Sequence, residues 1–286
     1  MPTAEQMVAS SVTLVTLPAV FIRVKSVVDD QTTTAIDLAK VISTDAAMTA
    51  RVLKLINSAF WGFGSRIDSL SRAVSLLGMI HVHDLVLATS VLETFERMRP
   101  EQMDVAKFWR GSLFRGLAAT ALARKSNLVD LGRVFVEALM SDLGHMVLYL
   151  KAPELAARAM KQSREQPWEL ARLERALIGC DFAQVGGELT DSWRLPPCFG
   201  ETIRYQNDPQ GAGEYALEAS LLHIAAIIAK LQGSEREKAA LVERISPSAW
   251  QIIGLSPDCL PEIIFEVETH LSATARLFGL PVSGAA

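Results

Sequence analysis

A histidine beside an aspartate is the combination in this sequence that could bind a transition metal, because imidazole and carboxylate are both ordinary metal ligands. The chain contains one such dipeptide, within His81-Val-His83-Asp84. Residues two positions apart on a helix point about 200° apart, so His81 and His83 cannot hold one ion between them. We therefore expect these residues to lie on a surface or interface helix and not at a metal site.

Nucleophilic and redox motifs are missing from the sequence. The cysteines are Cys180, Cys198 and Cys259, which are far apart and form no Cys-x-x-Cys pair. This pattern argues against a zinc knuckle or a redox dithiol and is typical of a reducing cytoplasm. Gly186-Gly187 follows no strand pattern and precedes no Lys-Ser/Thr, so we expect it to allow close helix packing and not to bind phosphate. No serine or cysteine occurs in a nucleophile motif with a base.

Residues 36–56 have the proportions of a helix-turn-helix motif, with two short helices and a turn near Asp45. A DNA-reading helix needs cations for the phosphates and polar side chains for the bases. The second helix offers only Arg51 and Lys54 as cations, and most of its other positions are apolar or small. The pattern favours a helix that packs in a core.

Three aromatic residues gather in the turn Phe60-Trp61-Gly62-Phe63-Gly64. Such a cluster buries a large apolar area. We expect it to pack one helical lobe onto the other, and the alternative is an anchor for a partner protein.

Helical patterns cover most of the chain, and no alternating stretch is long enough for a strand. Each predicted helix has a one-sided apolar stripe, which must be buried against other helices, so we expect an all-α fold of two packed helical lobes. The polar gap at 97–104 separates them. We expect one domain over 11–282, with an N-terminal lobe at 11–97 and a second lobe at 104–282. The predicted helices cover 20–29, 34–42, 46–59, 69–77, 80–95, 108–125, 134–152, 155–162, 167–178, 179–193, 198–207, 215–232 and 261–278, with a loop at 207–214.

Two ordered sets of residues carry a family resemblance. The first lobe contains Asn57, Ser58, Ala59, Phe60 and Gly62, followed by Leu77 and Gly78. The second contains Phe108-Trp109-Arg110-Gly111-Ser112 and the run 139–150. Together they resemble the two halves of the HDOD domain over about 14–208. The resemblance implies an all-helical, HD-like bacterial signalling domain that is related to the HD phosphohydrolases and is usually regarded as a non-catalytic regulatory module.

Active HD phosphohydrolases hold a divalent metal with histidines and aspartates, and the resemblance places other residues at most of those positions. The residues at the corresponding positions of this chain are Gly111, Ser141, Asp142, Asp181, Tyr205 and Ala226. Neither glycine nor a neutral serine hydroxyl replaces an imidazole ligand. Only Asp142 keeps the family's carboxylate, although Asp181 could still bind through oxygen. We therefore expect no catalytic residue, no metal and no cofactor, and a buried or capping role for Asp142.

The resemblance also implies a remnant of the substrate cleft. Its candidate ligand-binding or partner-binding residues are Trp109, Arg110, Arg115, Asp142, His145, Arg204 and Tyr205. Arginines in such a cleft favour an anionic ligand, for example a nucleotide second messenger.

Composition sets the expected surroundings. A formal charge of −4 gives no global attraction to nucleic acid or to an anionic membrane. The longest apolar run, 221–231, contains His223 and Lys230 and is shorter than the ~18 residues of a membrane span. The N-terminus lacks a basic and then apolar signal pattern. We expect a soluble cytoplasmic protein with no membrane partner, and we do not expect nucleic acid to bind.

These expectations combine into a bacterial HDOD protein that is not an enzyme. It acts in signal transduction by binding signalling or regulatory proteins, and a small anionic ligand in the vestigial cleft gates it by shifting the population of lobe arrangements about a hinge near 97–104. The alternative is a metal-dependent phosphohydrolase or cyclic-dinucleotide phosphodiesterase with residual activity. A helix-turn-helix DNA-binding regulator, which would bind duplexes in a salt-dependent way, is the third possibility.

Overall fold

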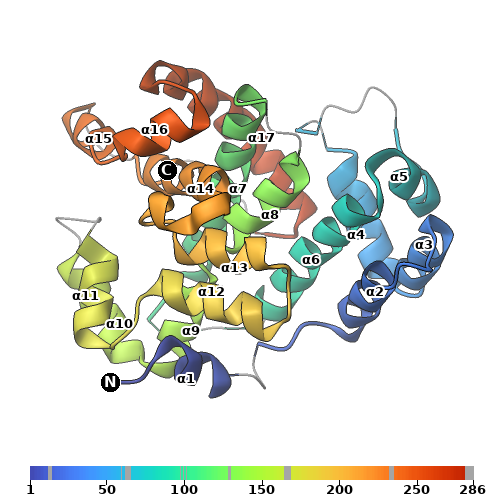
Figure 1. The fold of residues 1–286 in the computed structure, drawn as a ribbon, viewed down its shortest axis with the longest axis horizontal. Coiled ribbons are helices and arrows are strands. Elements are labelled where there is room, and N and C mark those ends of the chain that lie inside the picture. Colours follow the sequence, from blue (N-terminus) through green and yellow to red (C-terminus); the bar gives the residue numbers. More distant parts are fainter. Residues whose placement is uncertain are drawn as a thin grey trace. The chain divides into compact units, whose positions relative to one another are not determined.

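The protein is all-α, as predicted, and Figure 1 shows the helices in chain order. The computed structural model describes residues 1–11, 15–58, 60–61, 66–96, 98, 100, 102–127, 130–163, 169–231 and 235–280, with only the backbone of 96 and 235–238. No strand occurs within these ranges. The α-helices are α1 (Ala4–Ala9), α2 (Ala19–Asp29), α3 (Ala35–Ser43), α4 (Ala46–Ile56), α5 (Leu70–Leu77), α6 (Met79–Glu96), α7 (Val105–Lys125), α8 (Leu131–Met140), α9 (Leu143–Lys151), α10 (Pro153–Gln162), α11 (Leu170–Leu177), α12 (Phe182–Ser192), α13 (Pro197–Arg204), α14 (Ala216–Ile228), α15 (Glu235–Val242), α16 (Pro247–Ile253) and α17 (Leu260–Leu277).

The chain divides into two compact units. The larger unit contains residues 1–15 and 99–267, and the smaller unit contains 16–98 and 268–286. The chain therefore changes unit at three places. One lies between 98 and 99, inside the segment expected as a lobe boundary, and the others lie between 15 and 16 and within α17. Of that expected boundary and hinge, residues 97, 99 and 101 lie outside the described residues.

Helix starts in the smaller unit follow the capping signals of the sequence. The side chains of Thr34, Asp45 and Ser69 accept hydrogen bonds from backbone N–H groups in the first turns of α3, α4 and α5. Each cap satisfies a donor that the helix itself leaves unpaired. The apolar faces of α3 and α4 are buried as their periodicity predicts, with Ile42 and Val52 at 0% exposure. The predicted helices at 34–42 and 69–77 are confirmed.

Asn57 fastens the two ends of the turn that follows α4. Its Nδ2 donates to the carbonyl oxygens of Leu53 and Ile67 at 2.7 Å each, and its Oδ1 accepts from the backbone N–H of Ile67 at 2.7 Å. Gly78 has φ +84° between α5 and α6, a conformation that L-residues with a side chain rarely adopt. These two signature residues thus have structural roles.

The other signature residues of the smaller unit differ in burial, and two of them lie outside the described residues. Ser58 and Leu77 are half-buried, and Ala59 and Gly62 lie outside the described residues. Phe60 is buried and packs edge-on against Trp61 and against His270 of α17, with ring centroids 5.6 and 5.8 Å apart. These contacts lie within the smaller unit. The rest of the aromatic turn, 62–64, is outside the described part of the chain.

Helix α6 is largely buried, so of the expected surface or interface helix at His81–Asp84 the surface alternative was wrong. All residues from Val82 to Leu92 are buried. His83 and Asp84 lie side by side, with His83 Nδ1 2.9 Å from Asp84 Oδ1, and the His83 ring packs on Phe21 of α2. Apolar residues occur on all faces of its middle turns, and a helical segment of that kind is buried on every side.

The larger unit is built around α7, which packs along α8 and α14, while α12 packs on α9 and α13 (Figure 1). Glycine allows the closest approach. A Cβ on Gly144 of α9 would lie 1.9 Å from the carbonyl oxygen of Phe182, and one on Gly187 would lie 2.9 Å from that of Gly200. The prediction that Gly186-Gly187 permits close helix packing is confirmed.

Two expectations about the larger unit were wrong, and three of its helices were missed. The helix predicted at 134–152 is two helices, α8 and α9, which are interrupted at Ser141-Asp142. The loop predicted at 207–214 is a 3-10 helix, η2 (Pro209–Tyr215), in which Gly213 has φ +59°. The short helices α1, α15 and α16 were not predicted. None of the helices described is long and apolar enough to span a membrane.

Candidate functional site

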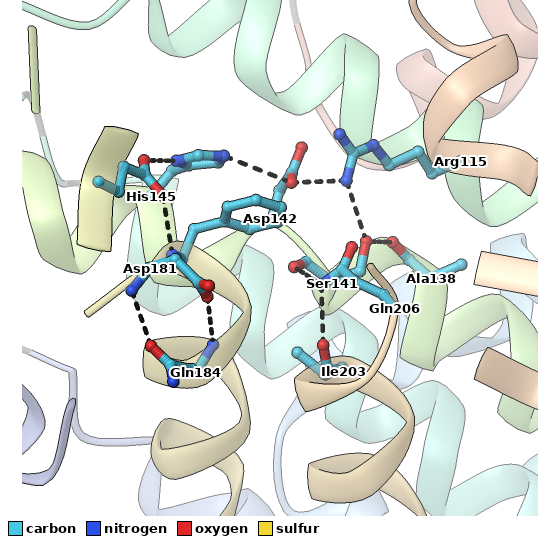
Figure 2. A network of polar contacts seen from close by, with 11 residues as sticks. Arg115, Ala138, Ser141, Asp142, His145, Asp181, Gln184, Ile203 and Gln206 are labelled. Carbon is cyan, nitrogen blue, oxygen red and sulfur yellow. Dashed lines mark hydrogen bonds and ion pairs between the residues drawn. The ribbon is translucent and has the colours of Figure 1, made fainter. Parts of the chain in front are cut away.

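The interruption between α8 and α9 directs Asp142 toward α7. Arg115 of α7 donates from Nη1 to Asp142 Oδ1 at 2.5 Å and lies 3.4 Å from the Ser141 hydroxyl (Figure 2). Asp142 occupies the N-cap position of α9 but makes no side-chain cap bond. Its carboxylate therefore pairs with the guanidinium, and of the two expected roles, buried or capping, the structure shows burial.

His145 lies between two carboxylates. Its Nδ1 is 3.0 Å from Glu174 Oε1 of α11, out of line for a hydrogen bond, and its Nε2 is 3.8 Å from Asp142 Oδ1. The ring stacks on Phe182, with centroids 4.1 Å apart. Glu174 is 1% exposed and accepts from the backbone N–H of Phe182 at 2.9 Å. Residues of α11 and α12 therefore surround the imidazole, and the Phe182 ring covers one of its faces.

Asp181 has a helix-capping role. It is the N-cap of α12, where Oδ1 accepts from the Gln184 N–H at 2.9 Å and Gln184 Oε1 accepts in return from the Asp181 N–H (Figure 2). Its other carboxylate oxygen pairs with Arg175. Both oxygens of Asp181 are thus already used by the protein.

Gln206 and His223 close another side of the cluster. Gln206 Nε2 donates to the carbonyl oxygens of Ser141 and Ile203, at 2.8 and 3.0 Å. His223 donates from Nδ1 to the Gln206 carbonyl oxygen at 2.9 Å, and its Nε2 accepts from the Ser246 N–H at 3.2 Å. This arrangement fixes the neutral tautomer, and burial lowers the pKa of His223 in the same direction. Neither ring nitrogen is available to a ligand.

These side chains adjoin a cavity of about 430 Å³ within the larger unit. Its wall includes Arg115, Gln206, His223 and Lys230. Burial and the neighbouring Arg115 charge lower the pKa of Lys230 to about 8, although Asp142 and Glu174 act in the opposite direction. The cavity wall therefore includes a half-buried lysine whose charged form is disfavoured by its surroundings.

The residues present do not fit the metal centre of an HD hydrolase. Arg115 binds Oδ1 of Asp142, and both ring nitrogens of His223 are hydrogen-bonded within the protein. Gly111 and Ser141 supply no imidazole. Among the described residues, no three His, Cys, Asp or Glu side chains are grouped in a way that could hold an ion.

The domain profile that matches this sequence is that of the HDOD domain, over residues 14–209. The chain belongs to the HDOD family. An uncharacterized protein of Treponema pallidum (strain Nichols) is 23% identical over 201 residues, which are 70% of this HDOD chain and 39% of that protein. The chain thus spans less than half the length of this curated relative.

Several crystal structures resemble this HDOD protein. A Shewanella amazonensis SB2B protein, provisionally assigned as a phosphohydrolase, has a TM-score of 0.73 and 23% identity, with 95% of this chain and 98% of that chain covered. A Geobacter sulfurreducens HDOD protein of unknown function has 0.67 and 19%, covering 93% and 97%. A Marinobacter aquaeolei VT8 protein, provisionally assigned to signal transduction, has 0.68 and 21%, covering 98% and 61%. At these identities the likenesses establish the HD-like fold.

The other expected site residues of this HDOD domain lie apart from the cavity wall. Trp109 is buried and packs edge-on against Phe108, and Arg110 is exposed. Arg204 pairs with Asp191 and Glu201 at 2.5 Å each. Of the predicted ligand-binding set, the structure brings together Arg115, Asp142 and His145, and Arg115 lines the cavity. The remaining members, Trp109, Arg110, Arg204 and Tyr205, are not among the residues that line it.

The vestigial metal positions are similarly divided. Ala226 lines the cavity, and Ser141 and Asp142 adjoin Arg115. Gly111 lies one turn before Arg115 on α7, with nothing within 4 Å of where its Cβ would be. Tyr205 caps the C-terminal end of α13, where its ring packs on Gly211.

Sequence reasoning missed several residues of this region. They are Glu174, Arg172, Arg175, Lys230 and Arg244. Lys230 carried a signal, because it interrupts a strongly apolar run in which a lysine is costly to bury. The arginines and Glu174 come from amphipathic or irregular segments, where charges are common and only the fold could bring them together.

The segment 36–56, considered above as a helix-turn-helix, forms α3 and α4, and its two cations on α4 differ in their contacts. Arg51 pairs with Glu93 of α6 at 2.8 Å, so one of the two cations on α4 is already engaged. Lys54 is exposed. The apolar face of α4, including Met48 and Leu55, is buried.

Proposed function

We propose that this HDOD protein is a non-enzymatic signal-transduction module that acts by binding another protein. The observation that carries the proposal is the contact between Arg115 and Asp142. The guanidinium supplies the positive charge that a metal would bring to the carboxylate, but it has no vacant coordination position at which to activate water. The HD-like fold is thereby stabilised around Asp142 without a group that could activate water for hydrolysis.

The charge balance around Asp142 supports this interpretation. A divalent ion at Oδ1 would have to displace Arg115 and would then lie beside both Arg115 and Lys230. Like charges in a buried site oppose one another strongly. The same residues that stabilise the carboxylate therefore disfavour the cation that catalysis would need.

Elemental analysis together with a phosphate-ester assay tests the proposal. The purified protein is expected to contain far less than one equivalent of Fe, Mn, Ni or Zn and to leave p-nitrophenyl phosphate intact when these metals are added. Near-stoichiometric metal with turnover, both lost in Asp142→Ala, would establish the phosphohydrolase alternative instead, which is the activity provisionally assigned to the Shewanella structure.

The protein-binding half of the proposal needs its own experiment. Cross-linking in the native cell followed by mass spectrometry is expected to enrich a defined signalling or regulatory protein over a control with an unrelated bait. A small anionic ligand in the cleft would gate this interaction by favouring one conformation over another. Enrichment of nothing beyond the control would contradict the proposed role.

A further inference from the structure

The wall of the cavity in the larger unit is strongly cationic. Five of its lining residues are cations, and one, Glu169, is an acid. The cations are Arg115, Arg172, Arg175, Lys230 and Arg244. Such an excess of one sign in a concave site raises the local concentration of oppositely charged ligands.

Most of the arginines have carboxylate partners, and Lys230 has none. Arg115 pairs with Asp142, Arg172 with Glu169 and Arg175 with Asp181. The Lys230 ammonium makes no hydrogen bond and no ion pair with the residues that the structure describes, apart from longer-range electrostatic interactions. A desolvated ammonium without a partner is costly, and a bound anion would remove that cost.

Lys230 and Arg115 act on each other as like charges, and both line the cavity. Two neighbouring cations suit a group that carries two negative charges and several acceptor oxygens, which describes a phosphate monoester better than a carboxylate. We propose that the cavity binds a small phosphate-bearing molecule, with its phosphate group between Lys230 and Arg115. This inference rests on the proposed function, since a hydrolase would consume such a ligand.

The remaining wall defines the body of the ligand. Leu170, Ala171 and Ile227 provide an apolar surface. Gln206 is 1% exposed, and its Nε2 donates both of the amide's hydrogen bonds. Its Oε1 has no donor among the described residues. A cavity of about 430 Å³ lies within the range of small-molecule sites, ~300–1,000 Å³. The ligand is thus expected to join a phosphate to a compact body with a hydrogen-bond donor.

Thermal-shift and calorimetric titrations test the inference. The probes are 5′-AMP, inorganic phosphate and adenosine, with sodium chloride at matched ionic strength. The two phosphates are expected to raise the Tm and to bind, and adenosine is not. Lys230→Met is expected to weaken the binding of 5′-AMP about 10- to 100-fold, the usual effect of losing a hydrogen bond to a charged group. Lys161→Met, which removes an exposed lysine of α10, is the matched control and leaves binding unchanged.

The outcomes separate this inference from the proposed function. Lys230→Met removes a cation that lacks a partner, so its Tm without ligand is expected to equal or exceed that of the wild type, and Lys230→Arg should keep binding if the methionine variant does not fold. Equal binding of 5′-AMP to wild type and Lys230→Met, or no binding of either phosphate, overturns the inference alone. Conversion of 5′-AMP to adenosine during the titration overturns the proposed function as well.

Discussion

The molecule contains two buried histidine-aspartate pairs with different surroundings. In the smaller unit, His83 and Asp84 are adjacent on α6, inside a run of buried residues and beneath Phe21. In the larger unit, Asp142 and His145 are three positions apart on and beside α9, and their neighbours are Arg115, Glu174 and a cavity with a cationic wall.

The difference shows that a His-Asp dipeptide alone does not identify a metal-binding or ligand-binding site. The adjacent pair has the better sequence match to a metal motif, yet it lies in the fully buried part of α6, 82–92. The spaced pair has the poorer match, yet it interacts with Arg115 and Glu174 from other helices, and Arg115 lines the cavity. Electrostatics at a site depend on which charges the fold brings within a few ångströms, and those charges come from distant parts of the sequence.

Arg115→Met is expected to break the second arrangement with the largest effect. It leaves Asp142 with most of its charge uncompensated, and losing one partner of a buried ion pair costs about 3–5 kcal/mol. Denaturant unfolding measures the free energy of unfolding. Arg124→Met on the same helix, where a half-exposed arginine pairs with Glu266, is the control and should cost at most about 1 kcal/mol.

The double variant Arg115→Met with Asp142→Asn completes this test. Removing both charges is expected to recover most of the lost stability, because no unpaired charge then remains buried. A double variant as unstable as Arg115→Met would mean that packing of the arginine stem, and not its charge on Asp142, holds the cluster together.

Replacing each histidine compares the two pairs directly. His83→Leu is expected to lose about 1–3 kcal/mol, since it removes the hydrogen-bond partner 2.9 Å from the buried Asp84 carboxylate. His145→Leu is expected to lose less, since its ring lies beside Asp142 and Glu174 without an aligned hydrogen bond. Only His145→Leu should weaken 5′-AMP binding, about 2- to 5-fold, because His145 lies beside Asp142, the partner of Arg115 on the cavity wall, whereas His83 lies in the smaller unit. Calorimetric titration of both variants measures this, and an equal loss of affinity in both would erase the distinction between the pairs.

The smallest expected effect is a pH dependence from Lys230. Its pKa is about 8 in the folded protein and 10.5 in the reference state, so between these values the unfolded chain binds more protons and stability rises with pH. Relative to Lys230→Met, the wild type should gain up to about 1.4 kcal/mol per pH unit from pH about 8 to about 10. Unfolding curves of both proteins at several pH values give this difference. A constant difference would place the ammonium in water, away from Arg115, Asp142 and Glu174.

Much of the fold followed from local sequence signals. Caps at Thr34, Asp45 and Ser69 and periodic apolar faces located the helices of the smaller unit, because these effects act within one or two turns. Similar signals were present but not used at Thr3, which forms a capping box with Gln6, and at Pro247, which begins α16. Short helices give weak periodicity, so they were missed.

The site depended on tertiary contacts. The break between α8 and α9 could not be predicted because the groups that meet Ser141-Asp142, namely Arg115 and Gln206, lie 26 and 65 residues away in the sequence. The sequence did indicate Arg115, Asp142 and His145 as candidates. It could not show that Arg204 pairs with Glu188, Asp191 and Glu201 or that Lys230 lines the cavity, since both depend on where α13 and α14 pack.

The amide of Asn57 closes the chain between itself and Ile67 into a ring. Lengthening a closed loop costs only about 0.6 kcal/mol for each doubling of its length. A peptide tag inserted between Asn57 and Ile67 should therefore leave α4 and α5 anchored as long as these two hydrogen bonds form.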